Sequence, residues 1–146
     1  MEQILSAPDK PGDASLRRIL EEARTIAVVG CSPKPERDSH RVARYLLEQG
    51  YRLIPVNPGQ REILGQKCYP DLQAIPQAVD IVDVFRRSEH IPPIAEAAAA
   101  MGARVLWLQL GIRNDQAADE ARRRGLTVIQ DACIMVEHRR LFSGGN

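Results

Sequence analysis

Residues 25–30 read Thr-Ile-Ala-Val-Val-Gly, an apolar run that ends at a glycine and continues into the polar loop Cys-Ser-Pro-Lys-Pro-Glu-Arg-Asp-Ser-His over residues 31–40. A continuous apolar segment of this length is typical of a strand buried on both faces, as in a parallel sheet. The same order of buried strand, loop and amphipathic helix returns along the chain. The stretch therefore predicts the first unit of a parallel α/β sheet.

Further strands are expected at 52–56, 81–85, 105–110 and 127–130, with a short edge strand near 67–69, and helices at 15–23, 39–49, 92–101, 115–124 and 134–140. Asp13 or Ser15 is expected to cap the first helix, and Asp38 or Ser39 the second. Parallel strands require right-handed crossovers. These features predict a single Rossmann-type, doubly wound domain of five to six strands with helices on both faces, covering residues 13–142 between a flexible lead-in (1–12) and a frayed tail (143–146).

The composition of the chain disfavours several classes of protein. The 146 residues carry 20 Lys and Arg against 19 Asp and Glu, a net charge of +1, which disfavours a nucleic-acid partner. No apolar run approaches the roughly 20 residues of a membrane span. Three widely spaced cysteines fit neither a disulfide framework nor a zinc site, so we expect a cytoplasmic protein. A homo-oligomer is compatible with the sequence.

In this architecture ligands bind beyond the carboxyl ends of the strands, where the strand order reverses. The loop Gly30–His40 leaves a buried strand and enters a helix N-terminus, where free N–H groups and the helix dipole favour phosphate. It also carries Lys34, Arg37 and the hydroxyls of Ser32 and Ser39. The loop predicts a phosphate site; the alternative is a loop capped by its own serine, with its charges in solvent.

The nucleotide expected there is not NAD. The dinucleotide fingerprint requires three glycines as GxGxxG and an acidic residue about 20 positions later. Here Gly30 is followed by Ser32 and Pro33, and the second strand ends at Asn57. The chain also lacks a GxxxxGK[ST] loop.

Other strand ends supply polar groups. Asn57 either binds a ligand or stabilises its own turn, while Arg86 and Arg87 suit phosphate or carboxylate or are simply solvated. Cys31 precedes a helix N-terminus, which lowers a thiol pKa, but a small buried residue is the alternative. No histidine has a partner at triad or metal-ligand spacing, so neither catalytic nor metal-binding residues are predicted.

These residues carry a family resemblance. The segments Ala27–Pro35, Pro55–Pro58, Val82–Arg87 and Trp107–Gly111, together with Glu137-His138, resemble those of stand-alone CoA-binding domain proteins, relatives of the CoA-binding domain of the succinyl-CoA synthetase α subunit. The resemblance covers about residues 16–142 and implies a Rossmann-type protein that binds coenzyme A or an acyl-CoA.

Carried over by position, the resemblance implies ligand contacts from four strand ends. The first loop would hold the phosphates, the second strand end would lie beside the nucleotide, the third would line the middle of the cleft, and the fourth would flank the pantetheine arm. The residues concerned are Gly30, Cys31, Ser32, Pro33, Lys34, Arg37 and Ser39; Asn57 and Pro58; Phe85, Arg86 and Arg87; and Gln109, Leu110 and Gly111.

The chain lacks the phosphohistidine and ATP-grasp domains of the synthetase, so ligase activity is not implied. A binding module is therefore expected rather than an enzyme. Two alternatives stay open: an enzyme acting on a CoA thioester through Cys133, Asp131 or His138, and an oxidoreductase that binds NADP or another nucleotide. A mixed disulfide of CoA with Cys31 or Cys133 is a further possibility.

Overall fold

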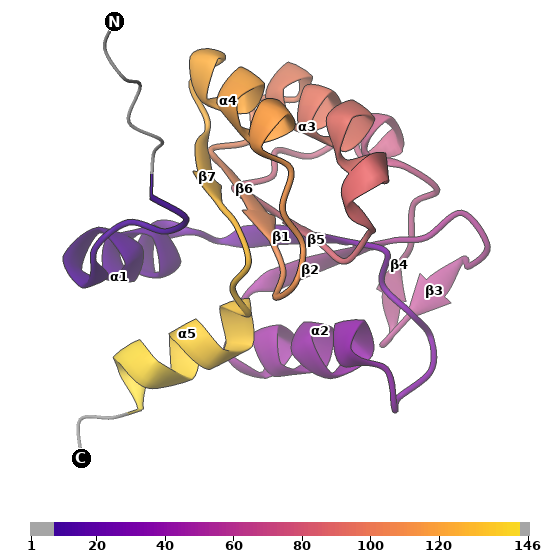
Figure 1. Cartoon of the computed structure of the whole chain (residues 1–146). Coiled ribbons are helices and arrows are strands. Elements are labelled where there is room, and N and C mark those ends of the chain that lie inside the picture. Colours follow the sequence, from indigo (N-terminus) through magenta and orange to yellow (C-terminus); the bar gives the residue numbers. More distant parts are fainter. Residues whose placement is uncertain (1–7, 144–146) are drawn as a thin grey trace, which may run out of the picture.

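Five parallel strands form the centre of the computed structural model, which describes residues 8–143 (Figure 1). They are β1 (Thr25–Val29), β2 (Arg52–Val56), β5 (Ile81–Val84), β6 (Val105–Leu108) and β7 (Thr127–Ile129). Their order in the sheet is β2-β1-β5-β6-β7, and every adjacent pair is parallel. The predicted doubly wound α/β fold is confirmed.

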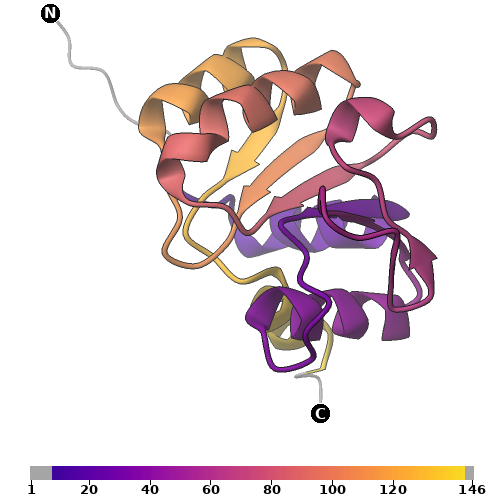
Figure 2. The same cartoon turned by 90° about the vertical axis from the view of Figure 1, so that its right-hand side faces the viewer.

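Helices cover both faces of the sheet, in two layers that Figure 2 shows from the side. One face carries α3 (Ile91–Ala100) and α4 (Asp115–Arg123), and the other carries α1 (Asp13–Glu22), α2 (Asp38–Glu48) and α5 (Ile134–Phe142). The β-strand side chains alternate between the two hydrophobic clusters, so that Val82 and Val84 pack with α3 and α4 whereas Ile81 packs in the cluster of α1, α2 and α5. Both faces are buried, which explains the continuous apolar strands in the sequence.

The predicted edge strand near 67–69 is instead a small antiparallel hairpin, β3 (Glu62–Ile63) with β4 (Gln66–Lys67), followed by the 3₁₀ turn η1 (Leu72–Ala74). Tyr69 makes only an isolated parallel bridge to Val56. The tight turn places Leu64 at φ 55° and Gly65 at φ 73°, and this turn reverses the chain before a longer strand can form. A second 3₁₀ turn, η2 (Ser88–His90), precedes α3.

Two helix starts differ from the expected ones. Helix α1 begins at Asp13 with Gly12 at the N-cap position, and α2 begins at Asp38 with Arg37 there; neither end has a side-chain cap. The expected capping by Asp13 or Ser15, and by Asp38 or Ser39, is therefore wrong. In α2 the reason is local, because the Ser39 hydroxyl accepts a hydrogen bond from the Ser32 backbone instead (2.9 Å).

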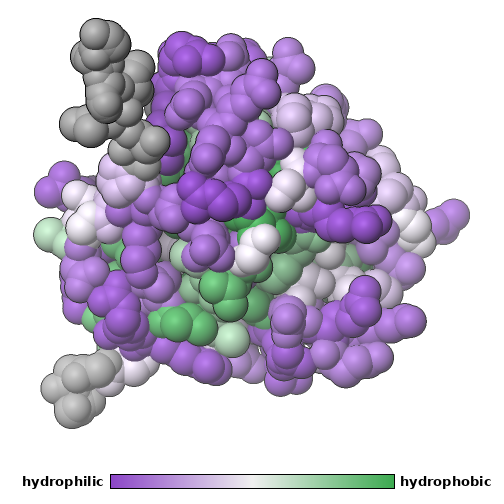
Figure 3. Space-filling view, viewed as in Figure 1, coloured by the Kyte–Doolittle hydropathy of each residue, from purple (hydrophilic) through white to green (hydrophobic). Residues whose placement is uncertain are grey.

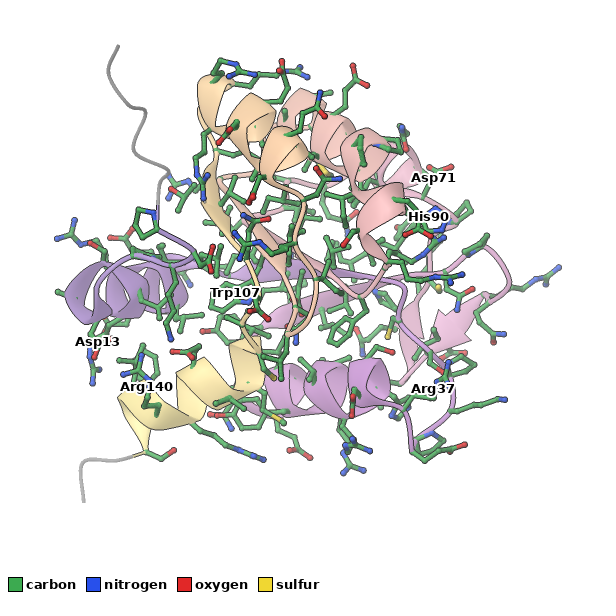
Figure 4. The ribbon with its side chains drawn as sticks, viewed as in Figure 1. Asp13, Arg37, Asp71, His90, Trp107 and Arg140 are labelled. Atoms are coloured by element: carbon green, nitrogen blue, oxygen red, sulfur yellow. The ribbon has the colours of Figure 1, made fainter. Side chains whose placement is uncertain are left out.

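The described part of the lead-in contacts the domain. The Gln130 backbone N–H donates to the Asp9 carbonyl (2.8 Å), and Lys10 pairs with Glu137 at 3.0 Å. Arg140 of α5 joins this network through Asp13, and these two side chains lie together in Figure 4. Of the predicted lead-in and tail, residues 1–7 and 144–146 lie outside the described residues, whereas Ser143 is the C-cap residue of α5.

Candidate functional site

The site that the fold creates lies between β1 and β5. The chain continues from β1 to β2 on one side and later places β5 on the other, so the strand order reverses between β1 and β5. Crevices for ligands open at such points, beyond the carboxyl ends of the strands. The loops that follow β1 and β5 therefore form the walls of the crevice.

Gly30 allows these two loops to meet. It has φ +83°, and a Cβ atom built on it would lie 2.7 Å from the Phe85 carbonyl oxygen and 3.1 Å from Cδ of Arg86. Only a glycine avoids both the unfavourable backbone conformation and this contact. The backbone of Gly30 and the Arg86 side chain consequently share the floor of the crevice.

The loop after β1 is held in place by its own polar groups. Ser39 accepts from the Ser32 N–H, and the Ser32 hydroxyl accepts from the Lys34 N–H at 3.1 Å. The Arg37 N–H donates to the Lys34 carbonyl at 3.0 Å, which closes a turn immediately before α2. Since no side chain caps α2, its first N–H groups are available to an external acceptor.

A cavity of about 350 Å³ opens at this helix end. Arg37 stands at this end of α2 (Figure 4). Two carboxylates also line the cavity, and that of Asp38 pairs with Arg41, whereas Glu36 has no described ion-pair partner. Arg37 and the helix dipole thus face a single uncompensated acidic side chain, Glu36. The lining residues are Gly30, Ser32, Glu36, Arg37, Asp38, Ser39 and Phe85.

A second cavity of about 210 Å³ adjoins the first at Gly30 and opens toward α3. Its walls are mostly apolar, and Arg86 and Asp71 are the charged residues among them. Such walls suit a flat, largely apolar group. The lining residues are Val29, Gly30, Val56, Pro58, Pro70, Asp71, Leu72, Gln73, Arg86, Pro93, Ile94 and Ala97.

Most of the residues that line this second cavity were not among the predicted site residues, including the stretch from Pro70 to Gln73. The signal available was Asp71, whose carboxylate accepts from the Ala74 N–H (3.0 Å) as an N-cap of η1. An Asp immediately before a short helical turn is a recognisable N-cap. That the turn would pack beside Gly30 could not be read from it.

Several predicted site residues instead support the loops. The Asn57 side chain donates to the Cys31 carbonyl (2.8 Å) and accepts from the Gly59 N–H (2.8 Å), so it stabilises both its own turn and the β1 loop. The Cys31 side chain is fully buried, and burial, together with Cys68 and Asp83, raises the pKa of its thiol to about 12. A contact of Cys31 with a ligand would therefore come from its backbone.

Arg87 and the residues that follow β6 do not line the two cavities. The Gln109 side chain is buried and accepts from the Ile134 N–H (3.2 Å), and the Gly111 N–H donates to Asp131 (2.7 Å). Leu110 is 70% exposed. Arg87 is exposed and its guanidinium lies 4.0 Å from Glu89.

The structure thus brings together some of the residues predicted to contact a ligand. Gly30, Ser32, Arg37, Ser39 and Phe85 line one cavity, and Gly30, Pro58 and Arg86 line the other. The remaining predicted residues follow β1, β2, β5 or β6 without lining either cavity: Cys31, Pro33, Lys34, Asn57, Arg87, Gln109, Leu110 and Gly111.

Two large apolar side chains are exposed. Leu110, after β6, and Val136, on α5, are the large hydrophobic side chains that stand exposed within residues 8–143. Figure 3 shows a hydrophobic area in the middle of one face, surrounded by polar residues.

Of the residues considered for thioester chemistry, Asp131 and Cys133 follow β7 at the carboxyl edge, whereas His138 lies elsewhere. His138 lines a different cavity with Thr25 and Arg52, at the amino ends of β1 and β2. It is therefore separated from the crevice by the length of the strands.

Within residues 8–143 no group of three or more His, Cys, Asp or Glu could hold a metal ion, and no helix there is long and apolar enough to cross a membrane.

Comparison with known proteins adds the family context. A family model described as a CoA binding domain matches residues 24–139. The Bacillus subtilis (strain 168) protein YneT is 44% identical over 128 residues, which are 88% of this chain and 95% of that protein. A structure from Pyrococcus horikoshii OT3, described as a hypothetical protein, has a TM-score of 0.89 and 42% identity, covering 97% of this chain and 99% of that one.

More distant similarity reaches larger proteins. The α subunit of acetate–CoA ligase (ADP-forming) I from Pyrococcus furiosus is 30% identical over 93 residues, which are 60% of this chain and 20% of that subunit. The chain therefore corresponds to about a fifth of the length of this relative.

Proposed function

The chain belongs to the CoA-binding domain family, as its sequence motifs predict, and from this premise we propose that it binds coenzyme A or an acyl-CoA in the crevice between β1 and β5. The observation that carries the proposal is the uncapped start of α2 beside Arg37, at the reversal of strand order. Free helix N–H groups and a guanidinium are the groups that bind phosphate most effectively.

The two adjoining cavities fit the two ends of the nucleotide portion. In the proposed arrangement the phosphates lie at the α2 end, with Ser32, Arg37 and Ser39, because that end carries the donors. The adenine ring lies in the apolar cavity between Pro58 and Ile94, where flat apolar surface is removed from water. Arg86 stands between them, with its Cδ close to Gly30.

The other predicted ligand contacts lie outside the two cavities. Lys34 and Arg87 are exposed on the loops beside the phosphate end and are proposed to act through charge alone. Gln109, Leu110 and Gly111 are proposed to flank the pantetheine arm as it leaves the crevice. No chemistry is proposed for the bound ligand. The similarity to acetate–CoA ligase covers about a fifth of that subunit, and His138 lies away from this crevice.

Isothermal titration of the whole chain with CoA tests the proposal, with dephospho-CoA, NAD and NADPH as comparators. We expect saturable CoA binding that weakens without the 3′-phosphate. Arg37→Ala should weaken CoA binding by about 10- to 100-fold, the value of a charge-assisted hydrogen bond to phosphate. Arg44→Ala is the matched control, because it removes the same charge from an exposed position further along α2 and should leave the affinity unchanged.

Absence of saturable heat with CoA, or NADPH binding that CoA does not displace, would overturn the proposal. Equal losses of CoA affinity in the Arg37 and Arg44 variants would leave CoA as the ligand but would contradict the proposed contact between Arg37 and a phosphate.

A further inference from the structure

A third cavity, of about 680 Å³, lies at the opposite end of the sheet from the crevice. It opens at the amino ends of β1 and β2, between the last turns of α1, α2 and α5. In Figure 1 these helix ends lie on the side where α1 and α5 are drawn, whereas the start of α2 points the other way. The cavity therefore shares α2 with the crevice but none of its lining residues.

His138 presents a nitrogen to this cavity. The side chain is buried to all but 8%, and its Nδ1 lies 2.7 Å from the Tyr45 hydroxyl. The ring is fixed further by the Phe142 ring, whose centroid is 4.6 Å away, and by the Tyr51 ring at 5.9 Å. Within residues 8–143, Nε2 has no hydrogen-bond partner, yet it is not sealed from solvent, so it opens to the cavity that His138 lines.

The hydrogen bond between the Tyr45 hydroxyl and Nδ1 has a direction that depends on the tautomer of the His138 ring. Burial lowers the pKa of His138, which favours the neutral ring. In the tautomer in which the Tyr45 hydroxyl donates to Nδ1, the ring carries its proton on Nε2 and offers the cavity an N–H donor.

Two arginines add positive charge beside this donor. Arg24 and Arg52 both line the cavity, and the Arg52 N–H donates to the Arg24 carbonyl at 2.8 Å, so Arg24, just before β1, is a neighbour of Arg52 at the start of β2. Neither guanidinium has an ion-pair partner in the described part of the chain. Glu21 is the acidic residue in the lining, and it pairs with Arg17 at 3.6 Å.

The rest of the lining is mixed: Leu20, Leu47 and Phe142 are apolar, whereas Thr25, Gln49 and Gln66 are polar. Two arginines without a described ion-pair partner, a histidine and these apolar side chains match an anionic group attached to a small hydrophobic body. We propose that the cavity binds a small organic carboxylate. Its charged end meets Arg24 and Arg52 and accepts from Nε2–H of His138, and its apolar body packs against Phe142. This ligand is distinct from the nucleotide proposed for the crevice.

The test is an NMR titration of the whole chain with benzoate, comparing benzamide as the neutral isostere and inorganic phosphate as the anion without an apolar body. The readouts are the His138 ring signals and the backbone amides of residues 47–52. We expect saturable shifts there with benzoate, at an affinity at least about fivefold above that for benzamide or phosphate, as expected for one or two solvated ion pairs.

Variants locate the binding. Arg24→Gln with Arg52→Gln should reduce benzoate affinity to the level of benzamide, and His138→Phe should weaken it while keeping an aromatic ring in the packing. Arg44→Gln is the charge-matched control on the outer surface of α2. Thermal unfolding confirms that each variant is folded.

Benzoate and benzamide binding with equal affinity would overturn the proposal, as would benzoate binding that survives the double arginine substitution. If phosphate bound as tightly as benzoate, the apolar body would contribute nothing to the affinity, and the proposal of an organic ligand would be wrong. None of these outcomes depends on whether CoA binds at the other end of the sheet.

Discussion

Gly30 and Phe85 approach so closely that a Cβ atom on Gly30 would lie 2.7 Å from the Phe85 carbonyl oxygen. The two residues end neighbouring strands, and the Phe85 N–H donates to the Val29 carbonyl at 2.8 Å. The contact is therefore with rigid backbone rather than with a movable side chain. The width of the crevice depends on the absence of a side chain at this glycine.

Gly30→Ala should destabilise the fold by about 2–4 kcal/mol, because the left-handed conformation costs about 1–2 kcal/mol and the backbone contact adds to it. Urea unfolding measures this loss. Gly102→Ala is the matched control, since Gly102 has a similar φ of +80° with nothing within 4 Å of the added atom. Its cost should be about 1–2 kcal/mol, and equal losses would contradict the contact argument.

Ser39→Ala should cost about 1–2 kcal/mol, because the Ser32 N–H then loses its acceptor in the β1 loop. The loop that carries Lys34 and Arg37 should also become less ordered, so amide exchange at residues 32–37 should accelerate. Ser15→Ala serves as the control, since Ser15 is exposed on α1 and should change stability by less than about 0.5 kcal/mol. Unchanged exchange in the loop would show that Ser39 does not hold it.

The strands and helices of the sheet could be predicted from the sequence, because each one is marked by residues that are close together in the chain. The apolar run from Thr25 to Val29 ends at a glycine with φ +83°, and Pro92 and Pro93 fall in the first turn of α3 as expected. Such signals depend on residues close in the chain.

The details that were missed depend on contacts between distant residues. Asn57 donates to the Cys31 carbonyl, 26 positions away, and this pairing has no periodic signature. The wall formed by Pro70 and Leu72 follows from the packing of η1 beside β1 and α3. His138 was singled out by its motif, but its separation from the crevice follows only from the docking of α5 against Tyr45.

Trp107→Phe should cost about 2–3 kcal/mol, through a smaller core side chain and a lost hydrogen bond. The Trp107 ring is fully buried on β6, and its Nε1–H donates to the Ala132 carbonyl at 2.8 Å. Urea unfolding followed by circular dichroism measures the change. Leu110→Ala, at an exposed position after the same strand, should change stability by less than about 0.5 kcal/mol.

Trp107 also provides a spectroscopic check, because it is the sole tryptophan of the chain. Its emission should be blue-shifted and resistant to acrylamide in the native protein. Emission typical of water-exposed indole would contradict the buried position.

Asp83 should make the protein less stable as the pH rises. Its side chain, on β5, is fully buried, and neither carboxylate oxygen has a hydrogen-bond partner among the described residues. Burial raises the pKa of this carboxyl well above its ordinary range, so the folded protein keeps it neutral at pH values where the unfolded chain ionises it.

The direction of this change in stability follows from the number of protons that the folded and unfolded states bind. Below the unfolded pKa of about 3.9 both states are protonated, and the stability contributed by the neutral carboxyl is fully present. Between that value and the raised folded pKa, folding takes up one proton, so stability falls by about 1.4 kcal/mol per pH unit from this group alone. The contribution is lost as the pH rises through the folded pKa.

Asp83→Asn removes this titration while keeping the size of the side chain. Urea unfolding of both proteins at pH 5, 6, 7 and 8 should therefore show the wild type losing stability relative to the variant as the pH increases. Asp119→Asn is the control, because Asp119 is exposed and its loss should leave the wild-type slope unchanged. Parallel pH profiles for wild type and Asp83→Asn would mean that Asp83 ionises in the folded protein, which would require a water or cation beside its carboxylate.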